Sequence, residues 1–150
     1  MKKYTSFARF QLRKDLPEAE QQKLRDSLAA YRRVIVTVTE QRLAPYQSFF
    51  AKFAPESPVI YVFYTPAKSM LQIQRAVSAA EAVVLAHASR DDVQERVADL
   101  LFGKATADGR LSASIGGLFP TGSGVTITPH TPFHFVPEEY GMKSEVLRRI

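Results

Sequence analysis

No cysteine occurs among the 150 residues. This absence excludes disulfide frameworks, thiolate metal sites and cysteine nucleophiles. Long apolar runs are missing as well, because the longest stretches, 34–38 and 59–64, are far shorter than the ~20 residues of a membrane helix. The basic Met1-Lys2-Lys3 is not followed by the apolar core of a signal peptide. We therefore predict no membrane span and no export signal.

Glycine is absent from the first 102 residues. All seven glycines come later, at positions 103, 109, 116, 117, 122, 124 and 141, and four of the nine prolines lie beyond residue 119. Because glycine and proline mark turns, this shift predicts regular elements first and irregular chain afterwards. The length suits one domain. We expect an α/β sandwich domain over residues 1–128 and an irregular Gly/Pro-rich C-terminal arm or interdomain linker over residues 129–150.

The formal net charge is +5 at pH 7. Lys and Arg are nevertheless scattered along the chain, whereas nucleic-acid-binding proteins cluster them with stacking aromatic side chains. We expect a loose attraction to anions and no nucleic-acid partner.

Three short runs are rich in β-branched and aromatic residues, namely Val34–Val38, Val59–Tyr64 and Ala82–Ala86. Their nearly continuous apolarity is typical of strands covered on both faces of a parallel sheet. Their centres are about 25 and 23 residues apart, which is close to the length of a βαβ unit. We predict a three-layer αβα sandwich with a mostly parallel sheet, right-handed crossovers and a flavodoxin-like outline.

Apolar residues at helical spacing lie around and between these runs. The expected buried stripes are Leu24, Leu28 and Tyr31; Leu43, Tyr46, Phe50 and Phe53; Met70, Ile73 and Val77; and Val93, Val97, Leu100 and Leu101. Asp15 and Pro17 mark the expected start of the first helix. Before the last helix, Ser89-Arg90-Asp91-Asp92 resembles a capping box, and Gly103 fits the left-handed position after it.

Two weaker strands are also expected. Tyr4–Phe10 is interrupted by polar residues and would lie near a sheet edge. Arg110–Ile115 alternates apolar and polar residues, so it is predicted as a final strand.

The glycine-rich stretch 101–124 fails the test of a phosphate-binding loop. Such a loop needs Gly-x-x-x-x-Gly-Lys-Ser/Thr after a strand and before a helix. Gly103-Lys104 instead follows a helix and precedes Ala105, and no helix is predicted after the later glycines. We interpret these glycines as turn residues and expect no cofactor.

The histidines do not predict a metal site. His130 and His134 are four residues apart, but Pro132 between them prevents the helix that would place both on one face. His87 ends the third strand without a neighbouring acid or nucleophile, so a partly buried histidine bonded to backbone is the favoured interpretation. Glu138-Glu139 are interpreted as solvated charge, and no Gly-x-Ser-x-Gly elbow is present. We predict no catalytic residue.

The loops after the three central strands are expected to face a ligand or a partner, because open α/β sheets bind ligands at the carboxyl ends of their strands. The candidate binding residues in these loops are Thr39, Glu40, Arg42, Tyr64, Lys68, His87, Ser89 and Arg90.

A strand at 83–86 is followed by a helix ending in Leu101-Phe102-Gly103, then by Gly109-Arg110-Leu111 and by Thr121-Gly122-Ser123-Gly124. This succession, within roughly residues 20–128, resembles the C-terminal α/β sandwich domain of glycoside hydrolase family three. The family's proline after Gly-Arg-Leu is Ser112 here. Further on, Val136–Ser144 resembles the linker that leads, in some β-N-acetylglucosaminidase-like members, into a serine β-lactamase-like domain.

The resemblance implies a non-catalytic accessory domain that packs on a catalytic TIM barrel absent from this chain. The β-glucosidase branch carries a Glu-Gly-x-Asp loop where this chain has Thr39–Arg42, which favours the β-N-acetylglucosaminidase-like branch, whose acid/base group belongs to the barrel. The isolated chain would then be inactive, and its parent a periplasmic or secreted bacterial enzyme. A surface left bare by missing neighbours would favour self-association. The alternative is a small-molecule binding module, for a sugar or a nucleotide, with the same flavodoxin-like outline.

Overall fold

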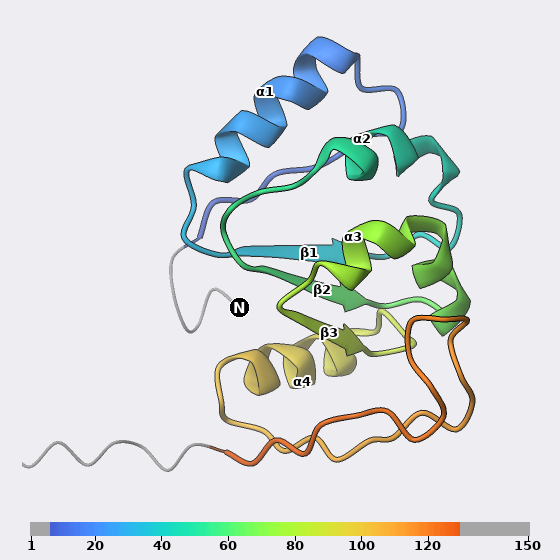
Figure 1. The fold of residues 1–150 in the computed structure, drawn as a ribbon. Helices are drawn as coiled ribbons and strands as arrows, with labels where there is room; N and C mark the ends of the chain where they lie inside the picture. The colour runs from blue at the N-terminus through green and yellow to red at the C-terminus, as the bar shows by residue number, and fades with distance from the viewer. Residues whose placement is uncertain (1–6, 130–150) are drawn as a thin grey trace, which may run out of the picture.

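The computed structural model describes residues 7–129 (Figure 1). In chain order the elements are α1 (Glu18–Ala29), β1 (Val34–Val38), the 3₁₀ helix η1 (Ala44–Tyr46), α2 (Gln47–Lys52), β2 (Val59–Phe63), the 3₁₀ helix η2 (Ala67–Ile73), α3 (Gln74–Ser78), β3 (Ala82–Leu85) and α4 (Asp91–Leu101). Within these residues no helix is long and apolar enough to span a membrane. The predictions for His130, His134, Glu138-Glu139 and Val136–Ser144 lie outside the described residues, as does nearly all of the predicted arm 129–150.

The three strands form one parallel sheet in the order β1-β2-β3. Val34 pairs with Val59 and Val38 with Phe63, and the next pair continues the register with Tyr61 opposite Val83. Parallel neighbours require a crossover between them, and the segments α2 and η2–α3 supply the two crossovers. The parallel sheet confirms the predicted α/β class.

Alternate strand residues build the larger core on one face of the sheet. Tyr61 and Phe63 of the central strand are almost completely buried there, at 1% and 0% exposure. α2 adds Phe49, whose ring stacks on Phe53 with the centroids 5.3 Å apart. Leu24 and Leu28 of α1 and Met70, Ile73 and Val77 of η2 and α3 join the same cluster. Helices α1, α2 and α3 therefore form the layer on this face (Figure 1).

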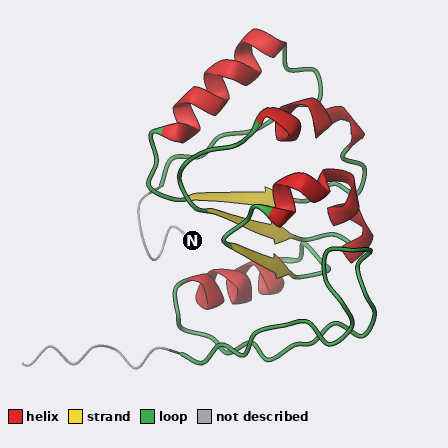
Figure 2. Cartoon of the chain, in the orientation of Figure 1, coloured by secondary structure: helices red, strands yellow, loops and turns green. Residues whose placement is uncertain are grey.

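The other face of the sheet packs against α4. Val62 of the central strand is fully buried and belongs to the same cluster as Tyr64 and Val97. Val93 and Leu101 of α4 pack against this cluster at helical spacing. With helices on both sides of the sheet (Figure 2), the three-layer αβα arrangement is confirmed.

The predicted stripe of α1 is partly wrong. Tyr31 lies beyond the helix end and is exposed, with its ring edge-on to Phe10 at a centroid distance of 5.7 Å. Arg25 is buried instead. Its Nη2 donates to Glu18 Oε1 at 2.8 Å, and its guanidinium carbon lies 5.6 Å from the ring centroid of Phe49. An arginine can take this place because an opposite charge and an aromatic face receive it.

The end of α4 confirms the role expected of Gly103. This residue has a φ of 71°, in the left-handed region that glycine adopts without a steric penalty. Its N–H donates to the carbonyl oxygen of Leu100 at 3.1 Å, and the N–H of Lys104 donates to that of Asp99 at 2.7 Å. Together these bonds are the two of a Schellman motif, which satisfies the last helix carbonyls.

The starts of α1 and α4 contradict the predicted caps. α4 begins one residue later than expected, with Arg90 as its N-cap, so Ser89 is outside the capping position and no side chain caps the helix. The carbonyl of Ser89 instead accepts a bond from Gln94 Nε2 at 2.7 Å. Pro17 is the N-cap of α1, and Asp15 makes no capping bond. Asp91 and Asp92 lie in the first turn of α4, where their negative charges interact favourably with the helix dipole.

The strand predicted at Arg110–Ile115 is wrong, and residues 7–10, the described part of Tyr4–Phe10, form no strand. The chain reverses direction in a turn that follows Ile115. The N–H of Ile115 donates to the carbonyl oxygen of Phe119 at 2.8 Å, and Gly116 has a φ of 50°. The alternation of apolar and polar residues still indicates correctly that Leu111 and Ile115 face the core. They do so from a loop and not from a strand.

Residues 107–127 form what we call the return loop. Its two ends meet, because Ala107 and Ile127 exchange both backbone hydrogen bonds, at 3.0 and 2.7 Å. Further along, Leu111 N–H donates to the carbonyl oxygen of Ser123 at 2.9 Å. At Gly124 a Cβ atom would lie only 2.2 Å from the carbonyl oxygen of Gly109, so this crossing requires glycine.

Candidate functional site at the carboxyl edge

All three strands end at the same edge of the sheet, which we call the carboxyl edge. After β2 the chain turns toward the layer of α2 and α3, whereas after β3 it turns to α4 on the opposite face (Figure 1). Adjacent strands whose connections leave in opposite directions form a topological switch point, and open α/β sheets bind ligands in the crevice there. This geometry makes the edge the candidate functional site.

Two hollows lie at this edge, on either side of Lys68. The β1–β2 hollow has a volume of about 380 Å³ and is lined by Gln41, Arg42, Pro66, Lys68, Ser69 and Gln72. The switch-point hollow measures about 250 Å³, and its lining combines Ala67, Lys68, Leu71, Leu85 and His87 with residues 110–116 of the return loop. The first is within the range of small-ligand sites and the second is just below it.

Glu40, at the end of β1, is an anchor of the loop that follows. Its Oε2 lies 3.0 Å from Lys14 Nζ, and its Oε1 accepts a bond from the Tyr46 hydroxyl at 3.0 Å. The bond from Lys14, followed by that from Tyr46, lowers the pKa of Glu40. Burial, followed by the bond to Glu40, raises the pKa of Tyr46. Glu40 is therefore held as a carboxylate whose two oxygens both have partners.

Gln72 ties the two walls of the β1–β2 hollow together. Its side-chain oxygen accepts from the backbone N–H of Leu43 at 2.8 Å, and its side-chain nitrogen donates to the carbonyl oxygen of Gln41 at 2.6 Å. An amide can satisfy a donor and an acceptor at once, which neither a carboxylate nor an apolar residue can do. The loop after β1 is thereby fixed to η2.

The turn from β2 into η2 is held by a buried hydroxyl chain. Ser69 Oγ donates to the carbonyl oxygen of Pro66 at 2.8 Å, so the 2.6 Å contact between Thr65 Oγ1 and Ser69 Oγ leaves Thr65 as its donor. Thr65 and Ser69 are 2% and 1% exposed, and each bond removes an unsatisfied polar group from the interior. This chain fixes the backbone from which Lys68 projects.

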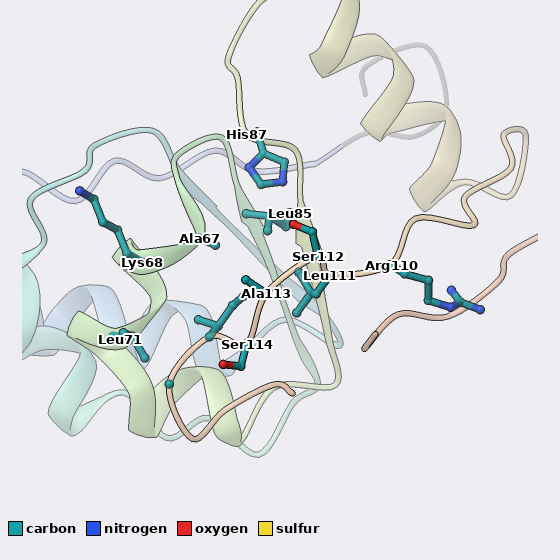
Figure 3. A pocket seen from close by; sticks show the side chains of 12 residues that line it. Ala67, Lys68, Leu71, Leu85, His87, Arg110, Leu111, Ser112, Ala113 and Ser114 are labelled. Atoms are coloured by element: carbon teal, nitrogen blue, oxygen red, sulfur yellow. The ribbon is translucent and has the colours of Figure 1, made fainter. Parts of the chain in front are cut away.

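The switch-point hollow has an apolar floor and a polar rim (Figure 3). Leu85 and Leu111 lie at the floor, while His87 stands at the rim near Ser112 in this view. The side chain of Lys68 extends away from His87, and that of Arg110 points out of the hollow (Figure 3), where it donates to Thr126 Oγ1 at 2.9 Å. Residues 110–116 of the return loop thus form one wall of this hollow, opposite η2 and the end of β3.

The interpretation of His87 as a partly buried histidine is wrong. Its side chain is exposed and its backbone has a φ of 62°. Ala88 N–H donates to the carbonyl oxygen of Ala86 at 2.8 Å, so His87 is the central residue of a γ-turn. This turn redirects the chain from β3 toward α4, which leaves the imidazole at the rim of the hollow.

The structure places the eight predicted binding residues in different surroundings. Arg42 and Lys68 both line the β1–β2 hollow, and Lys68 and His87 both line the switch-point hollow. Tyr64 is buried on the α4 side, where burial raises its pKa. Arg90 is paired with Asp92 at 2.8 Å. The remaining three, Thr39, Glu40 and Ser89, line neither hollow.

Several residues that line the two hollows are not predicted by the sequence analysis. Gln41, Ser69 and Gln72 are polar residues without a recognisable motif, and their contribution depends on contacts between segments that are distant in the chain. The sequence predicts a strand over residues 110–115, although Gly109 and Gly116 on either side of it indicate a loop.

Among residues 7–129, no cluster of three or more histidine or acidic side chains could hold a metal ion. Comparison of the chain with protein-family models, with curated proteins and with solved structures finds no match in any of the three.

Proposed function

We propose that this α/β sandwich is a non-catalytic accessory domain of a β-N-acetylglucosaminidase-like glycoside hydrolase of family three. Its carboxyl edge would pack against a catalytic TIM barrel encoded outside these 150 residues. A serine β-lactamase-like domain would be a further neighbour on the C-terminal side.

The observation that carries this proposal is the pairing of the two motifs on which the resemblance rests. Leu111, in the Gly-Arg-Leu segment, bonds through its N–H to Ser123 and through its carbonyl to Gly122, both in the later Gly-x-Gly segment. Gly124 and Gly109 approach so closely that no side chain fits between them. Since both motifs serve one structure, their joint occurrence supports the resemblance more strongly than either would alone.

The surroundings of Glu40 support a non-catalytic role. Retaining glycoside hydrolysis uses two carboxyl groups about 5 Å apart, one of which must exchange a proton with the leaving group. Glu40 is the carboxylate at the end of β1, and its lowered pKa and two hydrogen-bond partners suit a structural anchor better than a general acid.

The coding sequence immediately upstream of this chain tests the proposal. An in-frame barrel with its own acidic nucleophile is the expected result, and a stop codon directly upstream would contradict it. A second test is an assay of the purified chain on an aryl N-acetylglucosaminide. We expect no turnover; hydrolysis that Glu40→Ala abolishes would overturn the accessory role.

The alternative function, a small-molecule binding module, is favoured by the two hollows at the carboxyl edge. A thermal-shift series with flavins, nucleotides and amino sugars tests it. A raised midpoint with one of these, lost when Lys68 is replaced by Gln, would favour this alternative over the accessory role.

Self-association is a third expectation, because apolar side chains are exposed on this domain. Val125 is 74% exposed and Ile127, beside it on the return loop, 37%. Sedimentation velocity over a concentration series would detect a dimer, and a strict monomer at high concentration would remove this idea.

A further inference from the structure

We propose that the β1–β2 hollow binds the oxyanion of a small molecule, a carboxylate or phosphate group, between Arg42 and Lys68. This inference rests on the alternative function above, because the site lies at the carboxyl edge, which a catalytic barrel would cover. All of its lining residues lie within 41–72, so the isolated chain is sufficient for binding.

Charge is the first argument. Arg42 reaches the hollow from the loop after β1, and Lys68 reaches it from η2. Neither side chain has an ion-pair or hydrogen-bond partner among residues 7–129. Two cations that share one hollow repel each other, and a bound anion converts this repulsion into attraction.

The neighbouring acidic group does not cancel this charge. Glu40 precedes the lining residue Gln41, but its carboxylate is bound by Lys14 and Tyr46 and is absent from the lining. The lining of the hollow consists of two cations, two amides, a serine and a proline. The charged side chains of this lining are therefore all positive.

Rigidity is the second argument. Gln72 fixes Gln41 and Leu43 to η2, and the hydroxyl chain through Ser69 fixes the turn that carries Lys68. Both walls are thus held by hydrogen bonds that need no ligand. Such preformed walls reduce the ordering cost of binding. Arginine offers a planar fork to a carboxylate or phosphate, and lysine adds a mobile point charge beside it.

The size of the hollow sets the ligand class. A volume of about 380 Å³ accommodates a compact metabolite but not a folded partner. Two sources of the same chemistry remain, namely a phosphate ester and a carboxylic acid. Inorganic phosphate and citrate serve as probes that separate them.

The test uses the full 150-residue chain, labelled with ¹⁵N, at low ionic strength. We expect phosphate, citrate or both to shift the amide signals of Gln41, Arg42, Lys68 and Ser69 in a saturable way. Arg42→Gln and Lys68→Gln should each weaken binding about tenfold, the loss expected for one charge-assisted hydrogen bond. Binding should also weaken as salt is added.

Two matched variants control for net charge. Lys23→Gln on α1 and Arg96→Gln on α4 remove the same charges from exposed positions outside both hollows. They should leave binding unchanged. All four replaced side chains are exposed, so thermal midpoints close to that of the parent chain are expected.

The proposal is overturned if neither probe shifts the amides around the hollow. It is equally overturned if Lys23→Gln and Arg96→Gln weaken binding as much as the two site variants, because the attraction would then be a property of the whole surface. Response to phosphate alone assigns the site to phosphate esters, and response to citrate alone assigns it to carboxylic acids.

Discussion

Gln72 holds Leu43 by a 2.8 Å bond from the Leu43 N–H to its side-chain oxygen, across 29 residues of sequence. The same amide donates to the carbonyl oxygen of Gln41. One side chain therefore supplies hydrogen-bond partners to two backbone groups of the loop after β1. The carboxyl edge depends on this clamp for its shape.

Gln72→Ala should therefore destabilise the domain by about 1–3 kcal/mol, because the Leu43 N–H loses its acceptor next to a buried side chain. Urea unfolding measures the loss, and hydrogen exchange should show faster opening at Gln41 and Leu43. Gln74→Ala, two residues on and exposed, is the control and should change stability by less than about 0.5 kcal/mol. Equal effects of the two changes would refute the clamp.

Gly124→Ala should destabilise the return loop, since the new Cβ would lie 2.2 Å from the carbonyl oxygen of Gly109. We expect a cost of about 1–3 kcal/mol, as for other overpacking changes. Gly117→Ala is the matched control, because no heavy atom lies within 4 Å of a Cβ at that position. The two midpoints of chemical unfolding should differ clearly, and coincident midpoints would contradict the close crossing.

Arg25→Ala should cost about 2–3 kcal/mol, because it removes the guanidinium that lies over Phe49 and bonds to Glu18. Arg25→Met keeps the apolar stem in place and should cost less. Arg96→Ala, on the exposed side of α4, should be nearly neutral. Thermal unfolding of the three variants checks this order, which would be wrong if Met were no better than Ala.

The loss of folding stability at acid pH should depend on Glu40. Its pKa is lowered in the folded state from the ordinary value of 4.5. The contribution of Glu40 to the free energy of unfolding is therefore complete above pH 4.5 and is lost as the pH falls through the folded-state pKa. In Glu40→Gln this dependence disappears, and stability should fall less steeply below about pH 4.5. Urea midpoints from pH 7 to pH 3 measure the slope. Glu56→Gln, an exposed carboxylate without an ion pair among the described residues, should leave the slope unchanged.

Much of the fold could be predicted from the sequence, because the relevant signals are local. Continuous apolar runs such as Val59–Phe63 predict a strand covered on both faces, and the spacing of Val93 and Val97 predicts the helix that covers one of them. Gly103 could be assigned a left-handed conformation because no other residue type suits the end of a helix so well.

The errors arise where distant contacts decide. Arg25 is buried because Phe49, 24 residues away, supplies an aromatic face, and no local pattern announces it. Arg110–Ile115 alternates like a strand, yet the same alternation suits a loop whose Leu111 and Ile115 pack inward. The clamp at Gln72 is invisible for the same reason, since an amide in a helical segment looks like an ordinary solvent-facing residue.

The exchange of hydrogen bonds between Ala107 and Ile127 closes the return loop at its base. Its tip can therefore gain residues at Gly117, where a Cβ would meet no heavy atom within 4 Å, without shifting either strand order or register. Doubling the length of such a closed segment costs only about 0.6 kcal/mol in closure entropy. Because Gly116 lies against Leu71 at the switch-point hollow, insertions there would reshape that hollow while the sheet behind it stays intact.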